Sequence, residues 1–231
     1  MEIGTLNANH IAFLLQGTMW TIALSAIACL GGGVLGMGIA LCRVASNQLL
    51  RVLSGVYVQL VQGTPPLVAM FLLYFGLPGL GFDVPALAAA GFALVVNVSA
   101  FLGEIWRGCI EAVPRQQWEA AECLALSRTQ RLVKVILPQA VRIAIPPTVG
   151  FSVQVIKNTS LASVVGFVEL ARSGQIINNS LFQPFVIYAV IALVYFALCY
   201  PLSRWSRVLE RRAGSWRRRT ALITPESMAA P

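Results

Sequence analysis

The feature of this chain that most restricts its fold is a series of long stretches without charge. No Asp, Glu, Lys or Arg occurs between Glu2 and Arg43, between Arg51 and Asp83, or between Asp83 and Glu104. Only 11% of the 231 residues are charged and 57% are hydrophobic, whereas soluble domains carry about 25% charged residues. This composition excludes a water-soluble enzyme and a disordered chain, and it indicates an integral membrane protein.

The apolar stretches are long enough for five membrane-spanning helices. The hydrocarbon core of a bilayer is about 30 Å thick, so a spanning helix needs about 20 predominantly apolar residues. We therefore expect an all-α integral membrane protein with five transmembrane helices. We place these helices near residues 18–42, 53–77, 86–106, 143–165 and 185–203.

The distribution of Lys and Arg predicts the orientation of these helices. In a five-span arrangement, 15 of the 17 basic residues fall in two connections and the C-terminal segment, which all lie on one side. Because basic residues accumulate in cytoplasmic connections, we expect the N-terminus outside and the C-terminus in the cytoplasm. The net charge of +8 is thereby explained by membrane topology, and no nucleic-acid partner is expected.

Motifs of enzymatic catalysis are missing from the sequence. The single histidine, His10, has no carboxylate neighbour, and no H-E-x-x-H, G-x-S-x-G or G-x-x-x-x-G-K-[ST] motif occurs. The glycines at positions 31–33, 36 and 38 lie inside the first span, where small residues let helices approach closely. The five cysteines form no C-x-x-C pair, so we interpret them as small apolar side chains and expect no metal.

The cytoplasmic connection between the third and fourth spans, residues 107–142, is too long for a turn and too polar for lipid. Trp118, Ala121, Leu124 and Ala125 recur at helical spacing and predict a helix with one apolar face. An amphipathic hairpin resting on lipid would show a similar pattern. The clustered carboxylates argue against that alternative, because an anionic leaflet would repel them.

A second short helix is predicted to follow within this connection. Ser127 can cap its first turn, with Gln130 in the third position as in a capping box. Pro138 is expected to end that helix or to tilt the chain toward the next span. The connection is therefore predicted to form a helix–turn–helix across the cytoplasmic face.

This segment resembles the EAA loop of the membrane subunits of ABC importers, whose pattern is E-A-A, three residues, G, nine residues and I-x-L-P. This chain has Glu119-Ala120-Ala121, then Ala125 in the glycine position, then Val135-x-Leu137-Pro138. In that family the loop forms the coupling helix that docks into a groove of the ATPase subunit. The resemblance implies ATPase-coupling roles for Glu119, Ala120, Ala121, Ala125, Leu137 and Pro138.

The resemblance covers about residues 16–212 and is strongest to the polar amino acid permeases, the histidine, glutamine, glutamate, arginine and opine group. It rests on the segments Gly17-Thr18-x-x-Thr21-Ile22, Gln62-Gly63-Thr64-Pro65, Asn97 to Gly108, and Lys157-x-Thr159-Ser160-Leu161. The chain departs from the family pattern at Gln62, Arg115, Gly150 and Asn158, where the family usually has Arg, Gly, Asn and Asp.

The resemblance implies a type I, MetI-like importer permease fold over residues 1–212, with a basic, flexible cytoplasmic tail at 213–231. It implies a second permease subunit, identical or related, in the bacterial cytoplasmic (inner) membrane, two cytoplasmic ABC ATPase subunits and an external substrate-binding protein. The partner ATPases would bind ATP and Mg²⁺, so this chain is expected to be a transport subunit without a cofactor of its own. An ABC permease for another small solute and a secondary transporter are the alternatives.

Polar side chains inside the spans are candidates for the substrate pathway, because they are costly in lipid. Lys157 could meet a substrate carboxylate, pair with Glu104, cap helix carbonyls or extend outward. Thr159 and Ser160 could line the path or bond back to the preceding turn. The segment Gly63-Thr64-Pro65-Pro66 is expected to break the second span, so Thr64 could line a cavity at the break or mark a plain kink. Asn97 could form an interhelical hydrogen bond in place of a substrate contact, and Glu104 could form an ion pair with Arg107.

Overall fold

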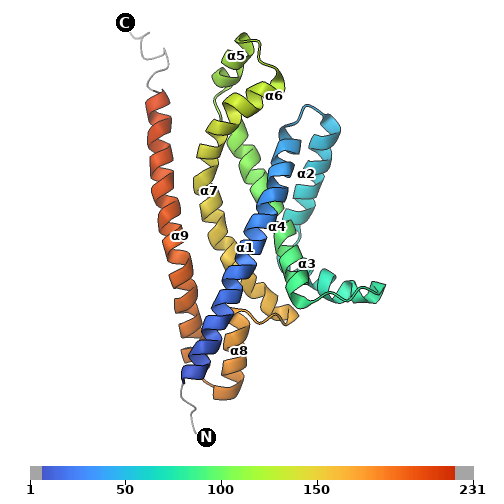
Figure 1. Ribbon diagram of the computed structural model, residues 1–231, viewed down its shortest axis with the longest axis vertical. Coiled ribbons are helices and arrows are strands. Elements are labelled where there is room, and N and C mark those ends of the chain that lie inside the picture. The colour runs from blue at the N-terminus through green and yellow to red at the C-terminus, as the bar shows by residue number, and fades with distance from the viewer. Residues whose placement is uncertain (1–6, 222–231) are drawn as a thin grey trace.

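The computed structural model describes residues 7–221, which are helical apart from short connections (Figure 1). The helices are α1 (Ala8–Val44), α2 (Gln48–Gly63), α3 (Pro66–Phe71), α4 (Ala86–Glu111), α5 (Arg115–Cys123), α6 (Arg128–Gln130), α7 (Leu137–Asn158), α8 (Leu170–Leu181) and α9 (Pro184–Ala221). Among the described residues, four helices are long and apolar enough to cross a membrane, and a bent pair makes a possible fifth. The expected all-α membrane architecture is confirmed.

Helices α1 and α4 form the centre of the bundle, and their close approach depends on glycine. A Cβ atom on Gly36 would lie 3.1 Å from the carbonyl oxygen of Ser99, and one on Gly32 would lie 2.5 Å from a methyl group of Val98. Leu24 and Leu94 are fully buried in the apolar core at this contact. The interpretation of the glycine-rich stretch as a packing surface is therefore confirmed.

The second expected span, residues 53–77, does not form one straight helix. Helix α2 ends at Gly63, and the segment Pro66–Leu80 leaves it at an angle of 96°. Consecutive prolines cause this break, because neither Pro65 nor Pro66 can donate a backbone hydrogen bond and each restricts the residue before it. The segment that begins with α3 consequently extends sideways from the bundle (Figure 1).

Of the two alternatives expected for Pro138, the end of a helix is wrong. A π-helical segment, Arg131–Ile136, leads directly into α7, and Pro138 lies in the first turn of α7. Because a π-helical turn is wider than an α-helical turn, it accommodates a ring that lacks an N–H group. One helical stretch therefore runs from Arg128 to Val165, and the helix that contains the expected fourth span, residues 143–165, begins before that span.

Three further boundaries differ from the expected ones. Helix α1 begins at Ala8, ahead of the predicted residue 18, because Asn7 and His10 form a capping box. Helix α8 was not predicted, and it packs beside the start of α1 (Figure 1). Helix α9 continues to Ala221, so residues 213–221 are helical where a flexible tail was expected, and residues 222–231 lie outside the described part.

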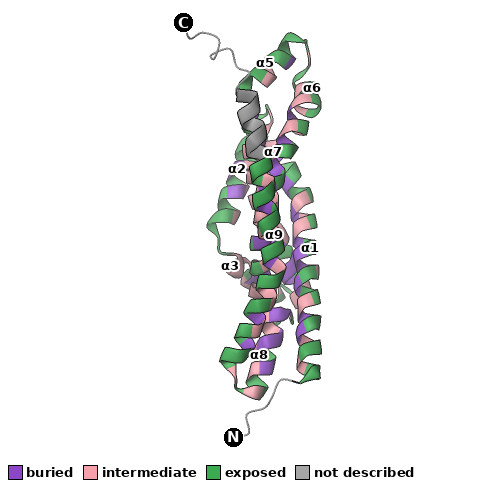
Figure 2. Cartoon of the chain, turned by 90° about the vertical axis from the view of Figure 1, so that its left-hand side faces the viewer, coloured by how far each residue is buried: buried purple, intermediate pink, exposed green. Residues whose placement is uncertain are grey.

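The hairpin of α5 and α6 and the helix α8 occupy opposite ends of the bundle (Figure 1). Helix α9 runs along one side, and exposed residues dominate the face that it turns outward (Figure 2). Large apolar side chains such as Leu193 and Phe196 are more than half exposed on this helix. A long, exposed, apolar helix is the arrangement expected of a surface in contact with lipid.

Candidate functional site

The first candidate site is the helix α5 at the end of the bundle. Glu119 and Ala120 are exposed, whereas Ala121 is only 3% exposed because it faces the rest of the hairpin. The prediction that Leu124 and Ala125 share one helical face with Trp118 and Ala121 is wrong. Helix α5 ends at Cys123, and Leu124 beyond it is 74% exposed. The exposed surface of α5 therefore carries the small side chain of Ala120 beside the carboxylates of Glu119 and Glu122, with Arg115 and Gln116 exposed in its first turn.

The turn that ends α5 is a Schellman motif with alanine in its glycine position. The backbone N–H of Leu126 donates to the carbonyl of Ala121, and that of Ala125 donates to the carbonyl of Glu122. Ala125 has a φ of 53°, which lies in the left-handed region that glycine usually occupies in this motif. An L-residue there is disfavoured by about 1–2 kcal/mol, so the surrounding contacts hold the turn against this cost.

Polar contacts fasten α5 to the base of α7. Glu122 Oε2 lies 2.8 Å from Nη1 of Arg131, and Gln139 Nε2 donates to Gln117 Oε1 over 3.2 Å. The predicted capping box is confirmed, because the Ser127 side chain accepts from the backbone of Gln130 and the Gln130 side chain accepts from the backbone of Ser127. The hairpin and the start of α7 are thus one connected unit.

An apolar cluster completes this attachment. Trp118 packs on a core formed by Ile110, Val113, Ile136 and Ala140. Leu137, which the sequence grouped with the coupling residues, packs on the same core, and Pro138 is exposed at the start of α7. Neither of these two residues lies on α5. Their position therefore favours a role in supporting the hairpin over direct contact with an ATPase subunit.

Glu119 has an exchangeable ion-pair partner on its own helix. Its Oε1 lies 3.0 Å from Nε of Arg115, one turn earlier, and the two side chains are 59% and 89% exposed. Exposed ion pairs of this kind contribute little to stability, because water competes with both partners. Glu119 can therefore exchange Arg115 for a basic group on another surface.

The second candidate site is a cavity of about 360 Å³ at the break between α2 and α3. It brings together two of the predicted pathway residues, Thr64 and Asn97, although they are far apart in the sequence. Asn97 is 5% exposed on α4, and Thr64 caps the end of α2. Three further polar side chains of this cavity were not among the candidates, namely Gln62, Gln154 and Asn158.

The polar lining of this cavity carries no formal charge. Gln154 Nε2 donates to Asn158 Oδ1 over 2.9 Å, so α7 offers a connected pair of amides. The stacked rings of Phe101 and Phe151, whose centroids are 5.3 Å apart, form part of its wall. Uncharged amides and hydroxyls both donate and accept hydrogen bonds, and they suit a neutral or zwitterionic polar solute.

The other pathway candidates, Lys157, Thr159, Ser160 and Glu104, are not among the residues that line this cavity. Lys157 is exposed, and it shares a face of α7 with Gln154 because the two are three residues apart. It forms no ion pair with Glu104. The hydroxyls of Thr159 and Ser160 donate to backbone carbonyls three residues earlier, which is the local alternative that the sequence left open.

Glu104 belongs to an ion-pair network at the other end of α4. It accepts from Arg107, as the spacing predicted, and from Arg43 at 3.4 Å. Arg107 also pairs with Glu111. Since Glu104 is not among the residues that line the cavity of α2, α4 and α7, its environment favours the structural alternative.

A buried carboxylate that sequence reasoning missed holds the opposite end of the bundle together. Glu169 is 0% exposed, and it accepts from the backbone of Ala171 and Arg172 and from the hydroxyls of Thr21 and Tyr195. Burial raises the pKa of its carboxyl, while the donated hydrogen bonds oppose that rise. Glu169 caps α8, a helix that the sequence analysis did not predict, so no sequence pattern indicated that this carboxylate would be buried.

The described residues define a helical membrane protein with an uncharged polar cavity and an exposed helical hairpin at one end. They contain no group of three or more His, Cys, Asp and Glu side chains that could hold a metal ion. The chain belongs to the family of binding-protein-dependent transport system inner membrane components, whose model matches residues 32–215. It is thus a permease subunit of the kind used by ABC importers.

Individual relatives agree with this family. The chain is 35% identical over 200 residues to a probable amino-acid ABC transporter permease protein, YckA, of Bacillus subtilis, covering 87% of this chain and 88% of YckA. It is 37% identical over 197 residues to the L-cystine transport system permease protein TcyB of the same organism, covering 85% and 84%. A crystal structure of an amino acid ABC transporter with histidines superposes with a TM-score of 0.84 at 31% identity, covering 90% of this chain and 100% of that one.

Proposed function

We propose that this chain is the membrane-spanning permease subunit of an ATP-driven importer for polar amino acids, located in the bacterial cytoplasmic membrane. The names of its relatives support the substrate class. The cavity at the α2–α3 break supports it independently, because amides and hydroxyls such as Asn97, Gln154 and Thr64 can bind a zwitterion without a net charge of their own.

The partners follow from the same proposal. A second permease subunit completes the pathway, two cytoplasmic ATPase subunits bind ATP and Mg²⁺, and an external binding protein delivers the solute. The surface of α5 with Glu119 and Ala120 supports docking of an ATPase, since small side chains permit close approach and the carboxylate can accept a basic partner. This chain itself holds no cofactor and carries out no hydrolysis.

One structural observation supports a mechanical connection between α5 and the cavity. A single helical stretch, Arg128–Val165, contains both the residues that fasten α5 and the residues that line the cavity. Arg131 and Gln139 hold the hairpin at its start, and Gln154 and Asn158 lie at the cavity toward its end. A displacement of α5 by the ATPase would therefore reach the cavity through one continuous element.

The coupling proposal is tested by reversing the charge on α5. We expect Glu119→Arg to abolish copurification of the ATPase subunit and substrate-stimulated ATP hydrolysis, because the carboxylate no longer meets its basic partner. Glu210→Arg is the matched control, since Glu210 is an exposed carboxylate on α9. Retention of the ATPase and of stimulated hydrolysis by Glu119→Arg would contradict the proposal.

The pathway is tested with the two lysines of the chain. We expect Lys157→Met to reduce uptake of labelled amino acids at least about tenfold while assembly persists, because loss of a charged hydrogen-bond partner costs about 1.5–3 kcal/mol. Lys134→Met, at an exposed position of the π-helical segment before α7, should transport normally. Normal transport by Lys157→Met would exclude a role of Lys157 in binding the substrate.

The cavity itself is tested by replacing one of its amides. Gln154→Met keeps an unbranched side chain of similar length, and it removes the donor to Asn158. We expect the apparent affinity for the amino acid to fall about five- to tenfold, with the ATPase still bound. A panel of labelled solutes distinguishes an amino acid importer from an importer of another small solute. Uptake of another solute, with no uptake of any amino acid, would contradict the proposed substrate class. The result of the coupling test would not change.

A further inference from the structure

A second cavity lies at the end of the bundle away from α8, at the base of the α5–α6 hairpin (Figure 1). Its volume is about 410 Å³, and it is formed where α1 ends, α2 begins, α4 ends and the hairpin follows. Four arginines from these separate segments line it, namely Arg43, Arg51, Arg115 and Arg128. Topology requires positive charge on the cytoplasmic side, but it does not require these side chains to meet at one concave site.

Carboxylates neutralise only part of this charge. Glu111 also lines the cavity, but it pairs with Arg107, which does not line it. Arg43 and Arg115 pair with Glu104 and Glu119, respectively. Within the part of the chain whose side chains are described, Arg51 and Arg128 form no salt bridge, and Arg128 donates to the carbonyl of Val44. In addition, Nε of Arg43 is buried without an acceptor. The cavity therefore has an excess of guanidinium groups, which bind phosphate oxygens in a favourable planar geometry.

The position of this cavity matches the polar boundary of a bilayer. Arg43 is the first charged residue after the uncharged part of α1, so it marks the level at which the apolar helix surface ends. Trp118 lines the same cavity, and tryptophan is enriched at the level of lipid headgroups. A headgroup at this depth would meet the arginines without leaving the membrane surface.

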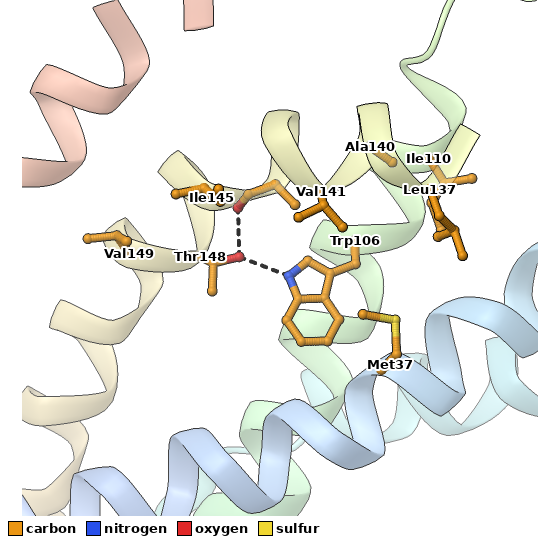
Figure 3. Close-up of a pocket in the computed structure, with 10 residues that line it drawn as sticks. Met37, Trp106, Ile110, Leu137, Ala140, Val141, Ile145, Thr148 and Val149 are labelled. Atoms are coloured by element: carbon orange, nitrogen blue, oxygen red, sulfur yellow. Dashed lines mark hydrogen bonds between the residues drawn. The ribbon is translucent and has the colours of Figure 1, made fainter. Parts of the chain in front are cut away.

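An apolar groove adjoins the basic cavity and shares the side chain of Ile110 with it. Its volume is about 310 Å³, and Met37 of α1, Trp106 of α4 and residues of α7 surround it (Figure 3). Its two side-chain polar groups satisfy each other within the protein, because Trp106 Nε1 donates to Thr148, which donates to the carbonyl of Ala144. The groove thus presents hydrocarbon only.

From this pairing we infer that the cytoplasmic end of the chain binds an anionic phospholipid. The phosphate lies in the basic cavity with Arg51 and Arg128, and an acyl chain lies in the groove beside Trp106. A free phosphate ion would use the cavity alone, and an acidic protein surface would not use the groove. The inference rests on the membrane location of the family and does not depend on the solute transported.

The experiment compares lipid retention by the assembled transporter. The complex is reconstituted in nanodiscs of phosphatidylcholine with about one fifth phosphatidylglycerol, extracted, and examined by native mass spectrometry for bound lipid. The test variant is Arg51→Gln/Arg128→Gln. The control is Arg207→Gln/Arg211→Gln, which removes two exposed arginines of α9 outside the cavity. We expect the wild type and the control to retain phosphatidylglycerol and the test variant to lose at least about 80% of it.

A second variant tests the groove and separates the sources of phosphate. Ile145→Gln places an amide in the groove and leaves all arginines in place, and we expect it to reduce lipid retention at least twofold. Inorganic phosphate should not displace the lipid. The inference would be overturned if the test variant and its control retained equal amounts of lipid, or if inorganic phosphate displaced the lipid. It would also be overturned if the test variant lost the ATPase subunit while its lipid retention stayed unchanged.

Discussion

Arg131 and Glu122 form an ion pair of 2.8 Å that joins the helical stretch leading into α7 to the helix α5. The Arg131 side chain is only 19% exposed, whereas that of Glu122 is 67% exposed. The pair therefore lies at the edge of the hairpin, where it fixes the direction of α5 relative to α7. A mutation at this junction can therefore separate two functions of the hairpin, namely the docking of the ATPase subunit and the transmission of its movement to α7.

We expect Arg131→Met to weaken coupling more than docking. Methionine keeps the apolar contacts of the arginine stem and removes the ion pair, which at this exposure contributes about 0.5–1 kcal/mol. Transport should fall about two- to fivefold while the ATPase subunit still copurifies. Arg142→Met, an exposed position on α7, serves as control. Unchanged transport by Arg131→Met at equal protein level would show that the junction does not transmit movement.

Replacement of Ala125 by glycine should stabilise the protein. The φ of 53° costs alanine about 1–2 kcal/mol relative to glycine, and the greater freedom of glycine in the unfolded chain offsets part of that gain. We expect Ala125→Gly to raise the thermal midpoint of the purified protein by a few degrees. Ala120→Gly, inside α5, should lower it, since glycine costs about 1 kcal/mol in a helix interior. A decrease in both variants would contradict the prediction.

The contact between α1 and α4 should be sensitive to a single methyl group. Gly32→Ala places a Cβ atom 2.5 Å from Val98, so the helices must separate, at a cost of about 1–3 kcal/mol. Gly38→Ala has no other atom within 4 Å of the new Cβ and should be neutral or stabilising. Thermal unfolding of both variants in detergent tests this difference, and equal midpoints would refute it.

The stability of the bundle end near α8 should depend on pH through Glu169. Because burial raises the pKa of this carboxyl, the folded state binds the proton more tightly than the unfolded chain does. Stability therefore falls as pH rises through the interval between the two pKa values. We expect the thermal midpoint of the wild type to increase relative to that of Glu169→Gln as the pH is lowered from about 8 to about 5. Glu210→Gln should follow the wild type, and a constant difference between wild type and Glu169→Gln would contradict the assignment.

The candidate sites could be predicted to different degrees. The spacing of Glu119, Ala121 and Ala125 identified the hairpin, because a docking helix is local in sequence and its cap, Ser127 with Gln130, is local as well. The polar cavity was found only in part. Thr64 and Asn97 were candidates because polar groups in a span are conspicuous. Gln154 resembles an ordinary polar residue of a helix until the fold places it in the lining of the same cavity as Asn97.

The sequence by itself determined the membrane location, the all-helical class, the hairpin and the family, because charge-free stretches of sufficient length and a fixed local motif require no knowledge of distant contacts. The consecutive prolines already indicated the break after Gly63, which measures 96° in the structure. Only the tertiary structure decided the position of α8 beside α1 and the buried network of Glu169. Each of these depends on how segments far apart in the chain pack together. The same packing gathers four arginines at one cavity, which the sequence showed only as dispersed cytoplasmic charge.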